Sequence, residues 1–345
     1  MQNGSQSSST ESTDKGAIAH KDTANDTSMR STADRNRLIG YTLAIAQAIL
    51  YSTMGVACKF LYGTGLSTGQ VVSLRYFGTV LVLGLFLLIW RKYPLFSRRP
   101  IVYVQGFFFV LCTILYYLSV RELTANVATV LFYAYPPMVA LMAAVVFKER
   151  PSARTVFALA VSMLGIVLLS GVIAGIVGTE DISFSPLGVA YGIGSCIAFA
   201  VYNIIGQMAV GKKDGPLTMT FSMCVVGVVM CVIAYPADIP TLVSVTPTQI
   251  GVALFMVVFN TIIPVVMLLE AIKRIGATMT SLIGISETPF AVLFAFLVLG
   301  ETLTGMQVAG SILVVLSILM VTLPSKQEKA SEKLAEQTSD QKPEA

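Results

Sequence analysis

Long apolar runs separated by short polar connections make up most of the chain. An α-helix needs about 20 residues to cross a hydrocarbon core of about 30 Å. Ten runs supply that length, at 38–58, 71–90, 101–120, 123–147, 155–178, 187–210, 216–236, 249–272, 275–299 and 302–323. They lack the period-two alternation of membrane β-barrel strands. The pattern predicts an all-α integral membrane protein with ten transmembrane helices.

Polar residues are concentrated at the two ends of the chain. Only 12% of all residues are charged and 55% are hydrophobic, whereas soluble domains average about 25% charged residues. Residues 1–37 and 324–345 are polar segments, and we expect both to be disordered tails. Between them we expect two domains of five helices each, over 38–178 and 186–323.

Lysine and arginine residues alternate between the connections in a way that predicts orientation. Almost all of them fall in the tails and in every second connection. The connections in between hold only Arg121 and, at the end of the first run, Lys59. Basic connections stay on the cytoplasmic side of a membrane. The sequence therefore predicts a multi-pass protein of the cell (plasma or cytoplasmic) membrane with both termini in the cytoplasm.

Several classes of function lack support in the sequence. The basic residues sit at the edges of apolar runs and form no patch with interleaved aromatics, so we expect no nucleic-acid partner. The five cysteines lie inside apolar runs without C-x-x-C spacing, and His20 is the sole histidine, so we expect no metal and no cofactor. Gly206–Lys213 resembles a phosphate-binding loop but lacks its final Ser or Thr. We expect no enzyme.

An internal repeat relates the two halves of the chain. A shift of 152 residues superposes Pro137 on Pro289 and Glu149 on Glu301. Because each half contains an odd number of helices, the second half must lie upside down relative to the first. Inverted repeats are typical of carriers, whose two halves exchange inward-open and outward-open shapes around a central site.

These features resemble the EamA type of the drug/metabolite transporter superfamily over approximately residues 38–323. The resemblance is carried by the first-helix pattern from Tyr51 to Lys59, by Arg75, and by the proline and glutamate endings of the two repeats. It implies two repeats of five helices and a carrier of small organic solutes, often an exporter of amino acids, related metabolites or xenobiotics. The chain differs from the usual pattern at Tyr51, where Trp is commoner, and at Gln207, where a basic residue is frequent.

Ionisable residues inside the runs are functional candidates, because burying a charge in a bilayer is costly. Glu287 is the strongest candidate and precedes Thr288 and Pro289. The proline removes a helical N–H, so we expect an unpaired carbonyl beside this carboxylate. Glu287 would titrate a proton or bind a substrate amine. The alternative is a carboxyl group hydrogen-bonded to a neighbouring helix.

The other charged candidates have two interpretations each. Arg75 would bind a substrate carboxylate or snorkel to the membrane surface. Lys59 would contribute to the same site or stabilise a helix C-terminus. Glu149 and Glu301, which follow the repeated prolines, would cap the next helix or act as gate latches.

Polar and aromatic side chains complete the expected pocket. Tyr51 belongs to the first helix, and Tyr202 and Asn203 occupy the second-half equivalents of Met54 and Gly55, near the central cavity.

We expect a secondary active transporter, favoured as an exporter, that moves a small metabolite such as an amino acid by alternating access. Its partners would be a small-molecule substrate and the lipid bilayer. Protons are a candidate coupling ion. The sequence leaves the choice between a monomer and a homodimer undecided. The alternatives are a lipid or isoprenoid flippase, a membrane enzyme using the same cavity, and a non-transporting receptor or scaffold on the same fold.

Overall fold

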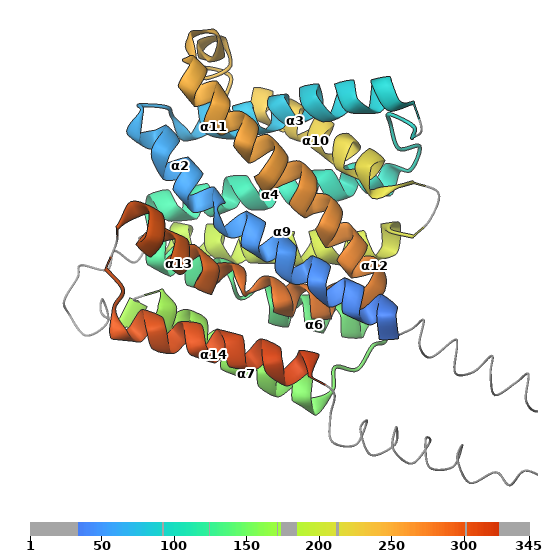
Figure 1. Ribbon diagram of the computed structural model, residues 1–345, viewed down its shortest axis with the longest axis vertical. Coiled ribbons are helices and arrows are strands. Elements are labelled where there is room, and N and C mark those ends of the chain that lie inside the picture. Colours follow the sequence, from blue (N-terminus) through green and yellow to red (C-terminus); the bar gives the residue numbers. More distant parts are fainter. Residues whose placement is uncertain are drawn as a thin grey trace, which may run out of the picture.

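The computed structural model describes residues 34–91, 93–123, 125–170, 172–173, 185–211, 214–300 and 302–323. Within these ranges the regular structure is helical and contains no strand (Figure 1). The two polar tails expected from the sequence lie outside the described residues, apart from 34–37 at the start of the first helix.

The chain forms a bundle of membrane-length helices. The first helix covers 34–52. The others are α2 Met54–Gly63, α3 Thr68–Trp90, α4 Pro100–Glu122, α5 Ala125–Phe132, α6 Tyr135–Val146, α7 Ala153–Leu169, α9 Pro186–Ala209, α10 Pro216–Ala234, α11 Pro247–Val257, α12 Ile263–Gly284, α13 Glu287–Leu299 and α14 Gly305–Thr322. A short 3-10 helix, η1, covers Pro240–Ser244, and a π-helical segment, η2, covers Val258–Ile262.

Eight helices in the described part of the chain are long and apolar enough to cross a membrane, and Ala153–Leu169 and Glu287–Val298 are shorter apolar helices. Together they match the ten predicted runs. The bundle also exposes large apolar side chains, with Leu81 72%, Val145 73% and Ile233 74% accessible. A soluble monomer rarely exposes such a surface, so lipid is the environment that this surface fits. The prediction of an all-α membrane protein is confirmed.

Local sequence explains where many of the helices begin. Pro100, Pro186, Pro216 and Pro247 occupy the first helical turn, where the missing N–H costs no hydrogen bond. Other helices start with a capping box, in which a hydroxyl and a glutamine satisfy free backbone groups reciprocally. These boxes are Ser67 with Gln70, Thr246 with Gln249, and Thr304 with Gln307.

Matching helix breaks support the inverted repeat. The fourth span is interrupted between α5 and α6 at residues 133–134, and the ninth between α12 and α13 at residues 285–286. The two breaks are separated by the 152 residues of the sequence repeat. The boundary between the eighth and ninth spans lies inside α12 at Gly276, whose φ of 76° and ψ of 165° end one helix and start another. Only glycine adopts this conformation readily.

The last helices of the two repeats, α7 and α14, pack closely against each other and lie side by side in Figure 1. Their backbones meet at Gly165 and Gly310, where an added Cβ on Gly310 would lie 2.5 Å from the Gly165 oxygen. Small residues allow this approach, which gives close van der Waals packing between membrane helices. The centre of the bundle is formed mainly by α4 packed on α9, with α10 against α3 and α4.

We expect Gly310→Ala to destabilise the protein. The new methyl group would lie 2.5 Å from the carbonyl oxygen of Gly165 and 2.7 Å from the amide nitrogen of Leu169, and neither backbone atom has freedom to move aside. Such overpacking costs about 1–3 kcal/mol, measurable as a lower unfolding midpoint in detergent. Gly305→Ala is the matched control, because nothing lies within 4 Å of its added Cβ. Equal midpoints for both variants would contradict this account of the α7 and α14 contact.

Candidate functional site

Arg75 lies in the interior of the bundle. It sits on α3 and is 5% exposed. Its Nε donates to the Thr261 hydroxyl at 2.8 Å and its Nη1 lies 3.7 Å from the Met54 sulfur. Its guanidinium lies over the rings of Tyr76 and Phe109, at 5.6 and 5.7 Å from their centroids. The snorkelling interpretation is therefore wrong, because α3 begins two turns earlier, at Thr68, and places this side chain inside the protein.

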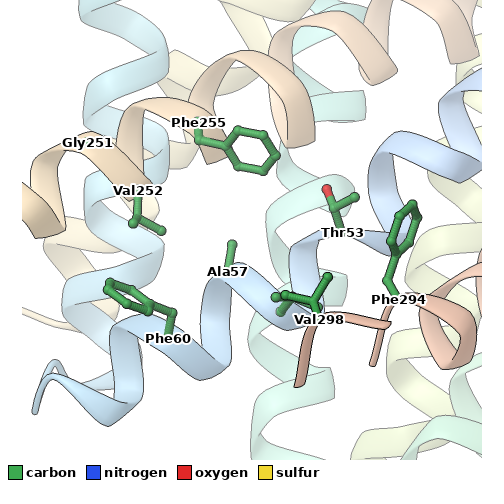
Figure 2. A pocket seen from close by; sticks show the side chains of 9 residues that line it. Thr53, Ala57, Phe60, Gly251, Val252, Phe255, Phe294 and Val298 are labelled. Atoms are coloured by element: carbon green, nitrogen blue, oxygen red, sulfur yellow. The ribbon is translucent and has the colours of Figure 1, made fainter. Parts of the chain in front are cut away.

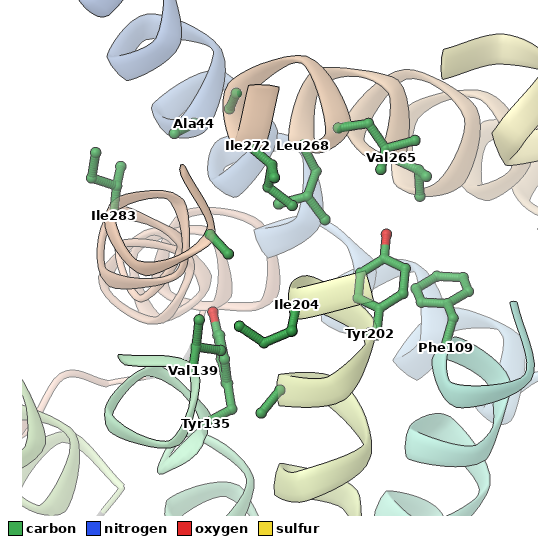
Figure 3. Packing of buried hydrophobic residues seen from close by; sticks show 14 of the residues in the cluster. Ala44, Phe109, Tyr135, Val139, Tyr202, Ile204, Val265, Leu268, Ile272 and Ile283 are labelled. Carbon is green, nitrogen blue, oxygen red and sulfur yellow. The ribbon is translucent and has the colours of Figure 1, made fainter. Parts of the chain in front are cut away.

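A file of aromatic rings runs from Arg75 across the bundle. Phe109 and Tyr202 have centroids 5.0 Å apart, Tyr202 and Phe199 5.4 Å, and Phe199 and Tyr135 4.6 Å. The rings come from α4, α9 and α6, so helices from both repeats meet here. Figure 3 shows Tyr202 beside Phe109 with its hydroxyl directed toward α12, and Tyr135 on the other side of α9.

Glu287 lies at the other end of this file. It is the first residue of α13, directly after the break in the ninth span, and it is partly exposed. Its carboxyl group lies near the Tyr133 side chain, which is at the equivalent break in the fourth span. Arg75 acts on it electrostatically. No ion pair joins Arg75 to an acidic side chain among the described residues.

The carbonyl expected to be free before Pro289 has a partner. The proline removes the N–H that would bind the Ile285 oxygen, but the Thr288 hydroxyl and amide donate to that oxygen at 2.8 and 3.0 Å. Ser286 similarly donates its hydroxyl to Ile283 O at 2.7 Å. The prediction of an unpaired acceptor beside Glu287 is therefore wrong. Hydroxyl side chains near a break satisfy the backbone locally.

Several buried polar atoms near this file have no hydrogen-bond partner. They include the hydroxyls of Tyr76 and Tyr202 and the Asn203 side-chain oxygen. Asn203 donates its amide to Phe199 O within its own helix, at 2.8 Å. An unpaired buried polar group costs about 1–3 kcal/mol, so such groups mark places where a ligand or water can bind.

The π-helical segment η2 joins Arg75 to the break in the first span. Asn260 donates from its amide nitrogen to Leu50 O at 2.6 Å and to the Thr53 hydroxyl at 2.8 Å. The next residue, Thr261, accepts from Arg75. Sequence reasoning missed this pair. The available signal was two adjacent polar residues in an apolar run, shortly before Pro264.

Gln207 connects three helices at one end of the bundle. We call this the basic end, because Arg99, Lys148, Arg154 and Arg274 lie at helix termini there. Gln207 donates its amide to the Glu149 carboxylate at 3.0 Å, and its side-chain oxygen accepts from Ala277 N at 2.6 Å. Ser152, rather than Glu149, caps α7 through Thr155 N. The capping interpretation of Glu149 is corrected accordingly.

The remaining sequence candidates lie at different places. Pro137 and Pro289 are in the first turns of α6 and α13, after the two breaks. Tyr51 is in the first helix and interacts electrostatically with Arg75 and Glu287. Lys59 is exposed on α2, away from this group. Glu301 lies outside the described residues.

A separate apolar groove of about 460 Å³ opens between α2, α11 and α13 (Figure 2). Thr53 is its only polar side chain. The groove is lined by Thr53, Val56, Ala57, Phe60, Gly251, Val252, Phe255, Phe294 and Val298. None of the residues predicted to bind substrate line it.

Comparison with known proteins identifies the family. The sequence profile of the EamA-like transporter family matches residues 38–171 and 186–323. The chain belongs to the EamA-like transporter family. Both five-helix repeats of the family are therefore present, and the resemblance to the drug/metabolite transporter superfamily is confirmed.

Relatives within the family are named as transporters. The uncharacterized transporter sll1319 of Synechocystis sp. is 28% identical over 67% of this chain and 71% of its own length. The threonine/homoserine exporter RhtA of Salmonella typhimurium is 26% identical over 75% of this chain and 83% of its own length. One solved crystal structure shares the fold, with a TM-score of 0.67 at 16% identity, over 87% of this chain and 99% of that one.

We expect Gln207→Leu to loosen the start of the ninth span. The substitution removes the acceptor of Ala277 N and the donor to Glu149, each worth about 1 kcal/mol. Hydrogen exchange of the amides in 277–284 should rise by about tenfold. Gln70→Leu is the matched control, since Gln70 bonds to Ser67 and Thr241 in another part of the bundle. Unchanged exchange in the Gln207 variant would show that the three-helix contact does not hold this segment.

Asn260→Leu should cost about 1–3 kcal/mol of stability, because the Leu50 carbonyl and the Thr53 hydroxyl lose a buried donor. The measurement is the unfolding midpoint in detergent. Asn203→Leu provides a comparison with the same chemistry, since its amide bonds only to its own helix and its oxygen has no partner. If Asn260→Leu loses no more stability than Asn203→Leu, the role assigned to η2 is wrong.

Proposed function

We propose that this protein is a secondary active carrier that exports a small organic metabolite through the region between Arg75 and Glu287. One observation carries the proposal. Two opposite charges, one from each repeat, lie beside helix breaks and are not paired with each other among the described residues: Arg75 is buried next to Met54 at the break in the first span, and Glu287 begins α13 at the break in the ninth. Broken helices at a repeat interface are where secondary transporters bind their substrates.

Amino acids and related metabolites are the proposed substrate class. RhtA, named as a threonine/homoserine exporter, aligns with three quarters of this chain. A solute with an ammonium group would suit the charge of the Glu287 carboxylate. The aromatic file supplies flat apolar walls for the rest of a small solute.

Proton coupling at Glu287 is the proposed energy source. A carboxylate that exchanges a proton for a substrate charge can link the two movements. Protonation would then release the substrate, and the emptied carrier would reset.

The Gln207 contact is the proposed gate at the basic end, with Glu149 as its latch. By the positive-inside rule this end would face the cytoplasm of a cell membrane. The bonds from Gln207 to Glu149 and Ala277 close that end, so opening toward the cytoplasm would require both to break.

Lipid translocation is a second candidate, favoured by the apolar groove between α2, α11 and α13. A groove of about 460 Å³ with a single hydroxyl would accept an acyl chain more readily than a charged metabolite. Movement of fluorescent phospholipid between the leaflets of vesicles containing the protein, with no flux of water-soluble solutes, would favour this candidate over the carrier.

We expect Glu287→Gln to abolish flux driven by a pH gradient. Wild type and variant are reconstituted in liposomes loaded with a pool of amino acids and related metabolites, and efflux is followed by mass spectrometry. Loss of a charge-assisted contact, worth about 1.5–3 kcal/mol, should lower flux by about tenfold or more. If Glu287 only couples protons, exchange of substrate across the membrane without a gradient should survive.

Glu270→Gln is the control, because Glu270 pairs with Arg274 at the basic end. Its flux should stay close to that of wild type. Wild-type flux in the Glu287 variant would remove this residue from the mechanism, and the absence of flux of any pooled solute in wild type would count against the carrier itself.

A further inference from the structure

Arg75 has more hydrogen-bond donors than its surroundings satisfy. A guanidinium carries five N–H groups, and this one meets one hydroxyl, on Thr261, and one thioether, on Met54, which is a weak acceptor. No carboxylate pairs with it among the described residues. A buried cation without an anion is costly, so an incoming anion would gain strongly from binding here.

Two unpaired hydroxyls accompany this cation. Tyr76 and Tyr202 are fully buried, at 0% exposure, and neither hydroxyl has a partner. Tyr76 lies next to Arg75 in sequence and its ring centroid is 5.6 Å from the guanidinium carbon. Tyr202 packs at 5.0 Å on Phe109, the other ring that the guanidinium faces. If packing alone mattered, phenylalanine would serve at both positions without the cost of an unpaired hydroxyl. Both hydroxyls are unused donors in the aromatic group around the guanidinium.

Neighbouring acidic groups do not supply the missing anion. Glu287 forms no ion pair with Arg75 among the described residues. Elsewhere the chain does pair an arginine directly, since Arg274 binds Glu270 one helical turn away. Arg154, which has a backbone carbonyl as its partner, lies at a helix start, whereas Arg75 is 5% exposed, so its unpaired charge is the costly one.

We propose that Arg75, Tyr76 and Tyr202 form the subsite that binds the carboxylate of the transported solute. This inference rests on the proposed function and specifies the chemistry of its site. A carboxylate matches the planar fork of a guanidinium and accepts from hydroxyls on its remaining lone pairs. A phosphate would bring nearly two negative charges to this single buried cation.

The test compares solutes that lack either the carboxylate or the ammonium group of an amino acid. Proteoliposomes of the full chain are loaded with equal amounts of L-threonine, threoninamide and 3-hydroxybutanoate, together with the corresponding sets for serine, leucine and phenylalanine. We expect wild type to export amino acids at least tenfold faster than their amides. Arg75→Gln should bring this ratio close to one, Arg75→Lys should restore part of it, and Tyr202→Phe should lower it severalfold.

Arg154→Gln is the matched control, since Arg154 is at an exposed helix start and bonds to Leu323 O, and its ratio should equal that of wild type. The ratio separates recognition from folding, because a merely structural role for Arg75 would lower the flux of all solutes equally. A second measurement needs no variant: the amino acids, and not their amides, should raise the unfolding midpoint of wild type.

Some outcomes would overturn the proposal. These are equal export of amides and amino acids by wild type, or an unchanged ratio in Arg75→Gln. If the broader screen detects export of other metabolites while no amino acid or hydroxy acid of this panel is transported or bound, the carboxylate subsite is rejected. The carrier function would still stand in that case. No flux in either experiment would reject both.

Discussion

Every backbone N–H and C=O inside a bilayer must find a partner within the protein, and this requirement shapes the functional region. The first, fourth, eighth and ninth spans all depart from regular α-helix at residues 53, 133–134, 258–262 and 285–286. The irregularities of the first, eighth and ninth spans have a nearby polar side chain that binds a backbone carbonyl, including Thr261, which donates to Met256 O. Asn260 binds the Leu50 carbonyl and Thr288 binds the Ile285 carbonyl. The chain can therefore place broken helices at the centre of a membrane protein without leaving polar backbone in lipid.

These repairs bring the charged side chains into one region. The segment that mends the first span also holds Arg75, because Asn260 and Thr261 are adjacent and contact the two elements separately. The break in the ninth span exposes Glu287 at the start of a half-helix, opposite Tyr133 at the equivalent break of the other repeat. A movement of η2 or α13 would therefore change the surroundings of both charges. A carrier needs such a link in order to couple binding to a change of shape.

The two repeats are equivalent in fold but not in chemistry. Arg75 belongs to the first repeat and Glu287 to the second, and at the basic end the first repeat supplies Glu149 while the second supplies Gln207 and Ala277. Inverted symmetry gives the bundle two similar shapes. The unequal side chains give those shapes different affinities for charge, and without such a difference a gradient could not favour one direction of transport.

The sequence by itself determined the ten spans, the inverted repeat and the family, because the length and polarity of each run are properties of local composition that the bilayer enforces. It also singled out Glu287 and Arg75 as costly intramembrane charges. Only the tertiary structure decided what each charge meets. Arg75 lies inside the bundle among Thr261, Tyr76 and Phe109. The Ile285 carbonyl is occupied by Thr288, and Glu149 binds Gln207 instead of capping a helix. These outcomes depend on contacts between residues far apart in the chain or on side-chain rotamers. The hydrophobic pattern constrains neither, because it specifies which helix faces are buried but not which polar groups meet there.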